Sequence, residues 1–127
     1  MLRDDVELES SLDDEEERCV EEWVVCRVCD HRLARVTDRI PDSEGLGIHG
    51  GAFVNPHGYL HTLAPYLSTP GAQIMGRFHA QDSWFQGYDW AMAHCGRCAT
   101  HLGWCFESVG GQPVRFWGLR LDAIRRS

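Results

Sequence analysis

The sequence predicts a mainly β domain built from antiparallel strands and held by one structural metal ion. Segments rich in β-branched and aromatic residues alternate with clusters of turn-forming residues. No segment with a convincing helical period follows the acidic N-terminal stretch. Two C-x-x-C pairs, with 65 residues between them, each lie where a turn between strands is expected. These three observations together indicate a small β fold that a structural metal ion stabilises.

The acidic charge of the chain is concentrated at its N-terminus. The 127 residues carry a net charge of -7, and residues 1–22 hold eleven acidic residues against two arginines. Residues 23–127 are therefore left with eight acidic and ten basic residues. We interpret 1–22 as a poorly ordered acidic tail and 23–127 as one domain with a modest core.

The strands of the domain are predicted in chain order from their composition. Residues 21–29 read as a strand that runs into the first cysteine turn, and residues 30–40 read as the returning strand. The turn formers of 41–51 indicate a loop. Residues 51–66 then predict a strand, an Asn-Pro-His-Gly turn and a second strand.

The second half of the chain repeats this organisation. Residues 68–73 indicate a loop. Residues 89–106 give a strand, the second cysteine turn and another strand. Residues 110–121 close the domain with a turn and a strand.

Four cysteines form a predicted tetrahedral zinc site, namely Cys26, Cys29, Cys95 and Cys98. A two-residue spacer lets both sulfurs of a pair reach one ion. Four thiolates leave no open coordination position, so the zinc is expected to be structural. A disulfide pair or unrelated thiols are the alternatives. Cys19 and Cys105 are left outside the site.

A partial resemblance points to an enzyme. The segment "HCGRCATHLGWCF" resembles the zinc region of B-type methionine sulfoxide reductases. That family needs a catalytic cysteine on a strand near the C-terminus, where this chain has Trp117, and no cysteine follows Cys105. The chain therefore lacks the nucleophile that the reductase hypothesis requires.

A fuller resemblance covers roughly residues 23–124. The segments "NPHGYLHTLAPY", "SWFQGYDW", "CGRCATHLGWCF" and "RFWGL", in this order, resemble the thalidomide-binding (CULT) domain of cereblon. The resemblance implies a β-tent, in which two antiparallel sheets meet near a single zinc ion. It also implies a pocket that takes a cyclic imide edge-in. The chain is similar to single-domain bacterial versions, so no ubiquitin-ligase adaptor is expected as a partner.

The resemblance assigns the pocket residue by residue. It places the walls on Trp84, Trp90 and Trp104 and the base on Phe106. It places backbone contacts on "QDSW", that is on Gln81, Asp82, Ser83 and Trp84, with the Asp82 carbonyl accepting from the imide and the Trp84 amide donating to it. It adds Asn55, Pro56 and His57 from a loop beside the pocket. Asp82 and Gln81 depart from the histidine and glutamate of cereblon itself, which puts affinity and ligand preference in question.

The resemblance implies a non-enzymatic binding module for cyclic imides. Thalidomide-type glutarimides, uracil or uridine-like ligands and C-terminal cyclic imides on proteins are the expected ligands. A reader of methylated or quaternary ammonium groups is an alternative, because an aromatic cage also attracts cations. A reductase-like or imide-hydrolysing β-tent enzyme is a further one. The tryptophans could also simply fill a core, and His101 is expected to support the fold.

Composition narrows the compartment and the partners. No secretory signal is visible, and no apolar run approaches the roughly 18 residues of a membrane span. The cytoplasm is therefore the expected location, with no membrane partner. The near-neutral body offers no basic stripe, so no nucleic acid polymer is expected to bind.

Overall fold

The computed structural model describes residues 22–41, 48–110 and 113–127. Residues 1–21 of the predicted acidic tail and residues 42–47 of the predicted loop lie outside the described residues. In the described part of the chain, no helix is long and apolar enough to cross a membrane.

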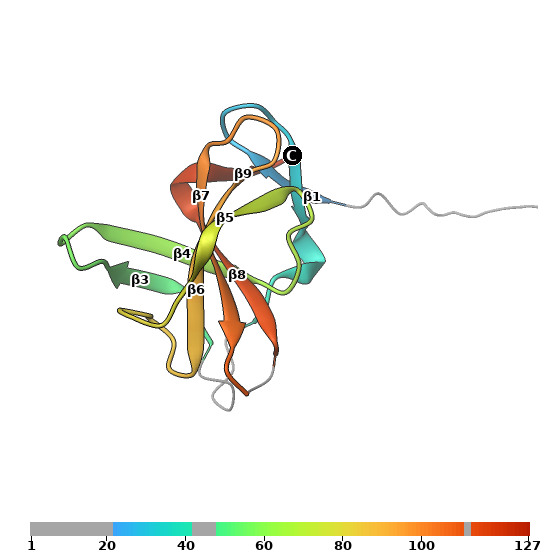
Figure 1. The fold of residues 1–127 in the computed structure, drawn as a ribbon. Helices are drawn as coiled ribbons and strands as arrows, with labels where there is room; N and C mark the ends of the chain where they lie inside the picture. The colour runs from blue at the N-terminus through green and yellow to red at the C-terminus, as the bar shows by residue number, and fades with distance from the viewer. Residues whose placement is uncertain (1–21, 42–47, 111–112) are drawn as a thin grey trace, which may run out of the picture.

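Two antiparallel sheets make up the fold, which confirms the predicted mainly β class (Figure 1). The small sheet has the order β2-β1-β9, with β1 at Trp23–Cys26, β2 at Arg32–Arg35 and β9 at Ile124–Arg126. The large sheet has the order β3-β4-β8-β7-β6-β5. Its strands are β3 Gly51–Val54, β4 Leu60–Tyr66, β5 Ala72–His79, β6 Tyr88–Cys95, β7 His101–Ser108 and β8 Arg115–Arg120. Two 3₁₀ turns, η1 Val36–Asp38 and η2 Leu121–Ala123, follow β2 and β8.

Two strands, β5 and β9, were not predicted from the sequence. Strand β5 is an edge strand, and its pairing with β6 shifts register between Met75 and His79, where Gly76 has a φ of 77°. This irregularity breaks the alternation by which a strand is recognised. Strand β9 has only three residues, too few for any pattern.

Strand β7 separates two hydrophobic cores. Leu102 and Cys105 point to the core between the two sheets, which also contains Trp117 and Leu119. Trp104 and Phe106 belong to a second core on the other face of the large sheet. Cys105 therefore faces away from Trp104 and Phe106, as strand alternation predicts.

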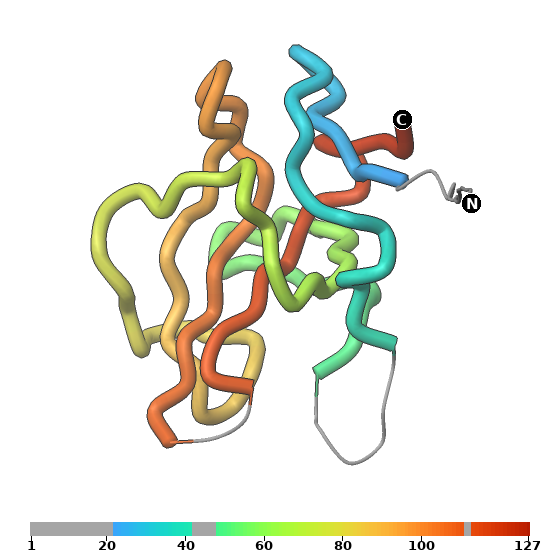
Figure 2. The backbone as a smooth tube through the Cα atoms, turned by 90° about the vertical axis from the view of Figure 1, so that its right-hand side faces the viewer, coloured from blue at the N-terminus to red at the C-terminus, as the bar shows by residue number. Residues whose placement is uncertain are grey.

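The two cysteine turns and the β3–β4 hairpin lie at different places in the fold. Figure 2 shows turns 26–31 and 95–100 side by side at one end of the molecule, where the two sheets meet. The β3–β4 hairpin projects from the large sheet, and the segment between β5 and β6 lies near it (Figure 1).

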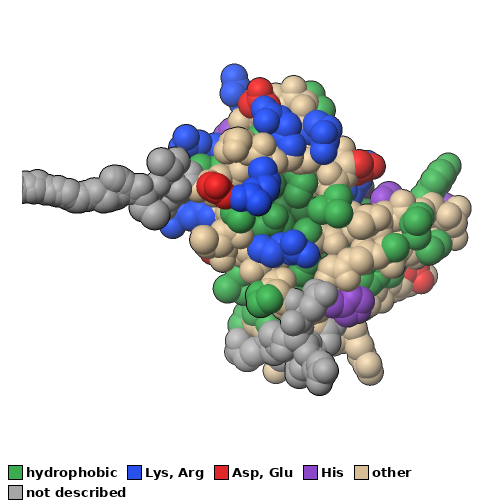
Figure 3. Space-filling view, turned by 180° about the vertical axis from the view of Figure 1, so that it is seen from behind, with side chains coloured by type: hydrophobic (Ala, Val, Ile, Leu, Met, Phe, Trp, Pro, Cys, Tyr) green, Lys and Arg blue, Asp and Glu red, His purple; other side chains and the backbone are tan. Residues whose placement is uncertain are grey.

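Arginine side chains lie in several separate groups on the back of the molecule, with acidic side chains among them (Figure 3). Around the small sheet, Arg125 pairs with Asp30, and Arg126 pairs with Glu22. These pairs compensate the positive charge locally, and the groups do not form one continuous stripe.

Candidate functional site: a four-cysteine centre and an aromatic pocket

The four predicted cysteines come together from the two sheets. Their sulfurs all lie within 4.8 Å of one another. The Sγ atoms of Cys26 and Cys98 are 3.7 Å apart, and those of Cys29 and Cys95 are also 3.7 Å apart. A tetrahedral zinc site with Zn–S bonds of about 2.3 Å requires sulfur–sulfur distances of about 3.8 Å. The donor set therefore has the spacing that a bound metal ion needs.

The two cysteine turns have the same backbone design. The residue after the second cysteine has positive φ in both, 64° at Asp30 and 67° at Ala99. Its amide donates to the carbonyl of the first cysteine, from Asp30 to Cys26 at 2.8 Å and from Ala99 to Cys95 at 2.9 Å. This matched geometry turns both sulfurs of each pair toward the same point.

The thiols of the centre differ in their environment. Cys26 and Cys95 are buried, with 0% and 1% exposure. Hydrogen bonds with Thr100 lower the pKa of Cys98 to about 6, whereas burial raises the pKa of Cys29 to about 12. A divalent metal ion holds all of its cysteine ligands as thiolates and would remove this difference.

A cavity of about 690 Å³ lies on the face of the large sheet that carries Trp104. Aromatic side chains, histidines and the β3–β4 turn surround it. Its lining consists of Asn55, Pro56, His57, Tyr59, His61, Asp82, Trp84, Trp90, Met92, His101, Trp104 and Phe106.

The three predicted tryptophans reach this cavity from three parts of the chain. Trp90 is on β6, Trp104 is on β7, and Trp84 lies in the segment between β5 and β6. The rings of Trp84 and Trp104 meet edge to face, with centroids 4.8 Å apart and an interplanar angle of 80°. Phe106 is 1% exposed and joins the core beneath them.

Hydrogen bonds fix the two outer tryptophans. The indole N–H of Trp84 donates to the Val54 carbonyl at 2.9 Å, and that of Trp90 donates to the Gln81 carbonyl at 2.6 Å. Since each indole has a polar partner, both rings are held in one orientation at the border of the cavity.

Asp82 and Trp84 carry the backbone groups that the resemblance assigned to the ligand. Asp82 has a φ of 62°, a conformation that aspartate tolerates better than most residues. Within the described part of the chain, neither the Asp82 carbonyl nor the Trp84 amide makes a hydrogen bond. One acceptor and one donor are therefore left without a protein partner beside the cage.

Most of the predicted contact residues gather at this cavity. Asn55, Pro56, His57 and Asp82 line it together with the tryptophans. Gln81 participates through its carbonyl, which holds Trp90. Ser83 borders a neighbouring cleft, and its hydroxyl donates to the Phe85 carbonyl at 3.1 Å. Its backbone contact with a ligand stays a prediction.

Four lining residues were not predicted as contacts from the sequence: Tyr59, His61, Met92 and His101. Met92 follows Trp90 by two positions, so strand alternation could have placed it on the same face. His101 was assigned only to the fold, yet its ring meets Trp104 edge to face at 4.9 Å. Cross-strand geometry, which a single sequence does not reveal, brings His61 to the pocket.

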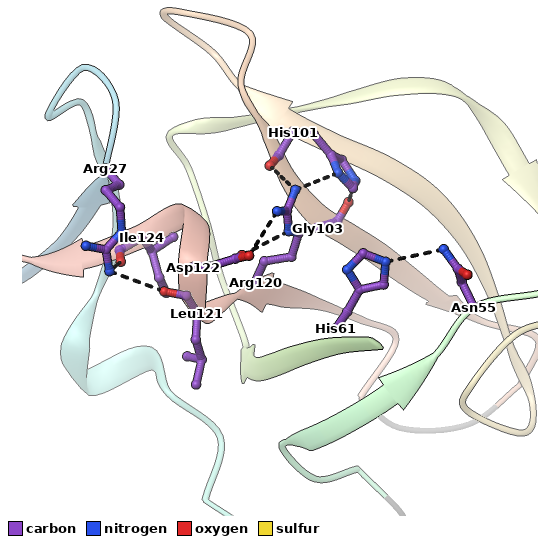
Figure 4. A network of polar contacts seen from close by, with 9 residues as sticks. All are labelled: Arg27, Asn55, His61, His101, Gly103, Arg120, Leu121, Asp122 and Ile124. Carbon is purple, nitrogen blue, oxygen red and sulfur yellow. Dashed lines mark hydrogen bonds and ion pairs between the residues drawn. The ribbon is translucent and has the colours of Figure 1, made fainter. Parts of the chain in front are cut away.

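His101 is held neutral by its surroundings (Figure 4). Burial, followed by the Arg120 charge, lowers its pKa to about 4. Its Nδ1 lies 3.2 Å from the Arg120 guanidinium and accepts from it, so Nε2 carries the proton and donates to the Gly103 carbonyl at 3.0 Å. Asp122 in turn binds Arg120 through both carboxylate oxygens. This network fixes the ring behind Trp104.

Sequence comparison relates this chain to known proteins. No family model matches the chain. It is 40% identical to the protein cereblon of Danio rerio over 83 residues, which are 62% of this chain and 19% of that protein. It is 33% identical to the protein cereblon of Drosophila melanogaster over 106 residues, 79% of this chain and 17% of that protein. The chain carries a cereblon-type domain.

The family assignment agrees with the resemblance drawn from the motifs. The chain is also 38% identical to the protein cereblon of Xenopus tropicalis over 76 residues, which are 58% of this chain and 17% of that protein. The chain spans less than a fifth of the length of these curated relatives. The cereblon-type domain therefore accounts for one part of proteins that are much longer.

Proposed function

We propose that this domain is a non-enzymatic module that binds cyclic imides in the cage of Trp84, Trp90 and Trp104. The observation that carries the proposal is the free donor and acceptor pair on Trp84 and Asp82 beside aromatic walls. An imide ring is flat, has donor and acceptors on one edge, and is otherwise apolar. The indoles cover its faces, and the backbone groups satisfy its edge.

The energetics of this arrangement favour a ligand with that polar edge. Each imide group left unpaired in a buried site costs about 1–3 kcal/mol, which the backbone partners avoid. The groups belong to a segment fixed by the indole hydrogen bonds, so little entropy is lost on binding. A ligand of eight or nine heavy atoms then reaches about -8 kcal/mol, or micromolar affinity. Glutarimides, uracil-type compounds and protein C-termini cyclised to imides have the required edge.

We assign the four-cysteine centre to one structural zinc ion. Four thiolates saturate a tetrahedral ion, so the metal would supply stability to the junction of the two sheets and no catalytic chemistry. Among the described residues, Cys105 carries the thiol outside this centre, and its environment supports a domain without catalytic activity. Cys105 is 0% exposed, and burial raises its pKa to about 12, so it is a poor nucleophile.

The second candidate function is recognition of a methylated or quaternary ammonium group. Asp82 lines the cage and offers a carboxylate, which such cations prefer. Competition separates the two proposals. If choline or trimethyl-lysine binds and uracil does not, the ammonium function is supported over the imide function. If uracil binds and neither cation displaces it, the imide function is supported.

The test of the cage is Trp90→Ala, with Trp23→Ala as the matched control on the small sheet. Trp90 is half-buried and borders the cavity, whereas Trp23 lies outside it. We expect Trp90→Ala to abolish imide binding, measured by calorimetry, while circular dichroism and metal content stay unchanged. Trp23→Ala should keep the affinity. An unfolded Trp90→Ala protein would instead assign this tryptophan to core packing.

A further inference from the structure

The turn between β3 and β4 is organised by the side chain of Asn55. Its Oδ1 accepts from the backbone amides of His57 at 3.0 Å and Tyr59 at 2.9 Å. The backbone of Asn55 adds two bonds, donating to the Tyr59 carbonyl and accepting from the Gly58 amide, both at 2.9 Å. This turn brings Asn55, Pro56, His57 and Tyr59 to the wall of the pocket.

The same amide identifies the protonation state of His61. Since Oδ1 accepts two amide protons, the other atom of the Asn55 side chain is Nδ2, which only donates. Nδ2 lies 3.3 Å from Nε2 of His61 (Figure 4). Nε2 must therefore be an acceptor, and the neutral ring carries its proton on Nδ1. A protonated His61 would present N–H to N–H and lose this bond.

His61 also packs into the cage. Its ring meets Trp104 edge to face at 5.0 Å and lies 6.1 Å from Trp84. The residue is half-buried on β4, opposite Phe53 of β3, which stacks on Trp84 at 5.4 Å. One imidazole thus contacts two cage walls and holds the Asn55 side chain of the turn.

From this juxtaposition we propose that His61 is a positioning residue of the pocket. Unprotonated, it anchors the Asn55 turn against the cage, and its protonation releases that turn and weakens ligand binding. The inference rests on the proposed imide-binding function for its affinity readout. The acceptor role of Nε2 does not depend on which ligand binds.

Ionisable groups of both signs surround His61. Asp122 and His101 interact with it electrostatically. Arg120 lowers the pKa of Asp122, so this carboxylate stays ionised. His101 stays neutral down to about pH 4 and adds no opposing charge above it. His57 and Asp82 are the other ionisable groups of the pocket wall and must be controlled.

The experiment measures uracil affinity by calorimetry between pH 5 and 8 in the whole chain and in three variants. For the parent we expect affinity to fall about threefold to tenfold on acidification, the worth of one neutral hydrogen bond. His61→Gln offers an amide oxygen to Asn55, so it should bind at pH 8 within about twofold of the parent and lose the acid dependence. His61→Leu should bind weakly at every pH. His57→Gln, the matched control, should keep the acid dependence.

Two results would overturn the inference. One is an acid dependence that persists in His61→Gln and disappears in His57→Gln. The other comes from ¹⁵N NMR of the ligand-free protein, where we expect His61 to be protonated on Nδ1 near pH 8 and where a proton on Nε2 would refute the proposed bond. If no variant binds uracil or glutarimide, the imide function fails, and the NMR result alone decides the role of His61.

Discussion

Removal of the metal ion should unfold this domain. Structural zinc contributes about 10–16 kcal/mol of apparent binding free energy at pH 7, whereas a domain of this size has a net stability of about 5–15 kcal/mol. The two sulfur–sulfur distances of 3.7 Å agree with the roughly 3.8 Å of a tetrahedral tetrathiolate site. If zinc contributes on this scale, we expect little or no stability to remain without the ion.

The assay is thermal unfolding followed by circular dichroism, with zinc content measured on the same samples. A strong chelator should abolish the cooperative transition, and added zinc should restore it. Cys95→Ser removes one ligand, and a loss of about 5 kcal/mol would lower Tm by more than about 20 °C. Cys105→Ala is the matched control, because that thiol is buried on the same sheet but lies outside the centre.

We expect Cys105→Ala to keep one zinc ion per chain and to lose only about 1–2 kcal/mol from the small cavity it creates. A metal-free protein that melts within a few degrees of the zinc-loaded protein would show that the metal ion is not structural. Equal destabilisation in the two cysteine variants would also contradict it.

Three further predictions concern the frame around the pocket. Gly103→Ala should cost more than about 3 kcal/mol in urea unfolding, since the added Cβ would lie 2.0 Å from the Gly118 carbonyl and φ is 147°; a loss below 1 kcal/mol would show that the two strands separate easily. Ala99→Gly should stabilise the second cysteine turn by up to about 1 kcal/mol, because glycine relieves the positive φ of 67°, and a lower Tm would contradict this. His101 takes up its proton near pH 6.5 when unfolded and only near pH 4 when folded, so it lowers stability as pH falls through this range. His101→Gln should therefore flatten the pH dependence of the free energy of unfolding between pH 6.5 and 4. The change in slope should be less than about 1.4 kcal/mol per pH unit, the value for one fully linked proton, because the ring is only half-buried. An unchanged slope would count against a neutral His101.

The cysteine centre was the part of the molecule most accessible to prediction. A C-x-x-C pair fixes two ligands by local spacing alone, so Cys26, Cys29, Cys95 and Cys98 could be named before any fold was known. The alternation of β7 was equally local, and it placed Cys105 on the face opposite Trp104 and Phe106.

The histidines of the pocket could not be assigned in this way. His61 reaches Asn55 because β3 and β4 pair in a register that puts it opposite Phe53. His101 lines the pocket because β6 and β7 shift register between Ala93 and His94, an irregularity that no periodic pattern encodes. The hydroxyl of Ser83 bonds with the Phe85 backbone, so any contact of Ser83 with a ligand would use its backbone, as its place in "QDSW" predicts.

The proposed role of the three-tryptophan cage is to bind a cyclic imide. Titration of the zinc-loaded protein with uracil and with thalidomide, followed by intrinsic tryptophan fluorescence, tests it directly. We expect saturable quenching by both compounds, which Trp90→Ala removes and Trp23→Ala retains. A flat response to both, from protein that holds one zinc ion, would rule out imide binding and leave the ammonium-binding function as the one to test.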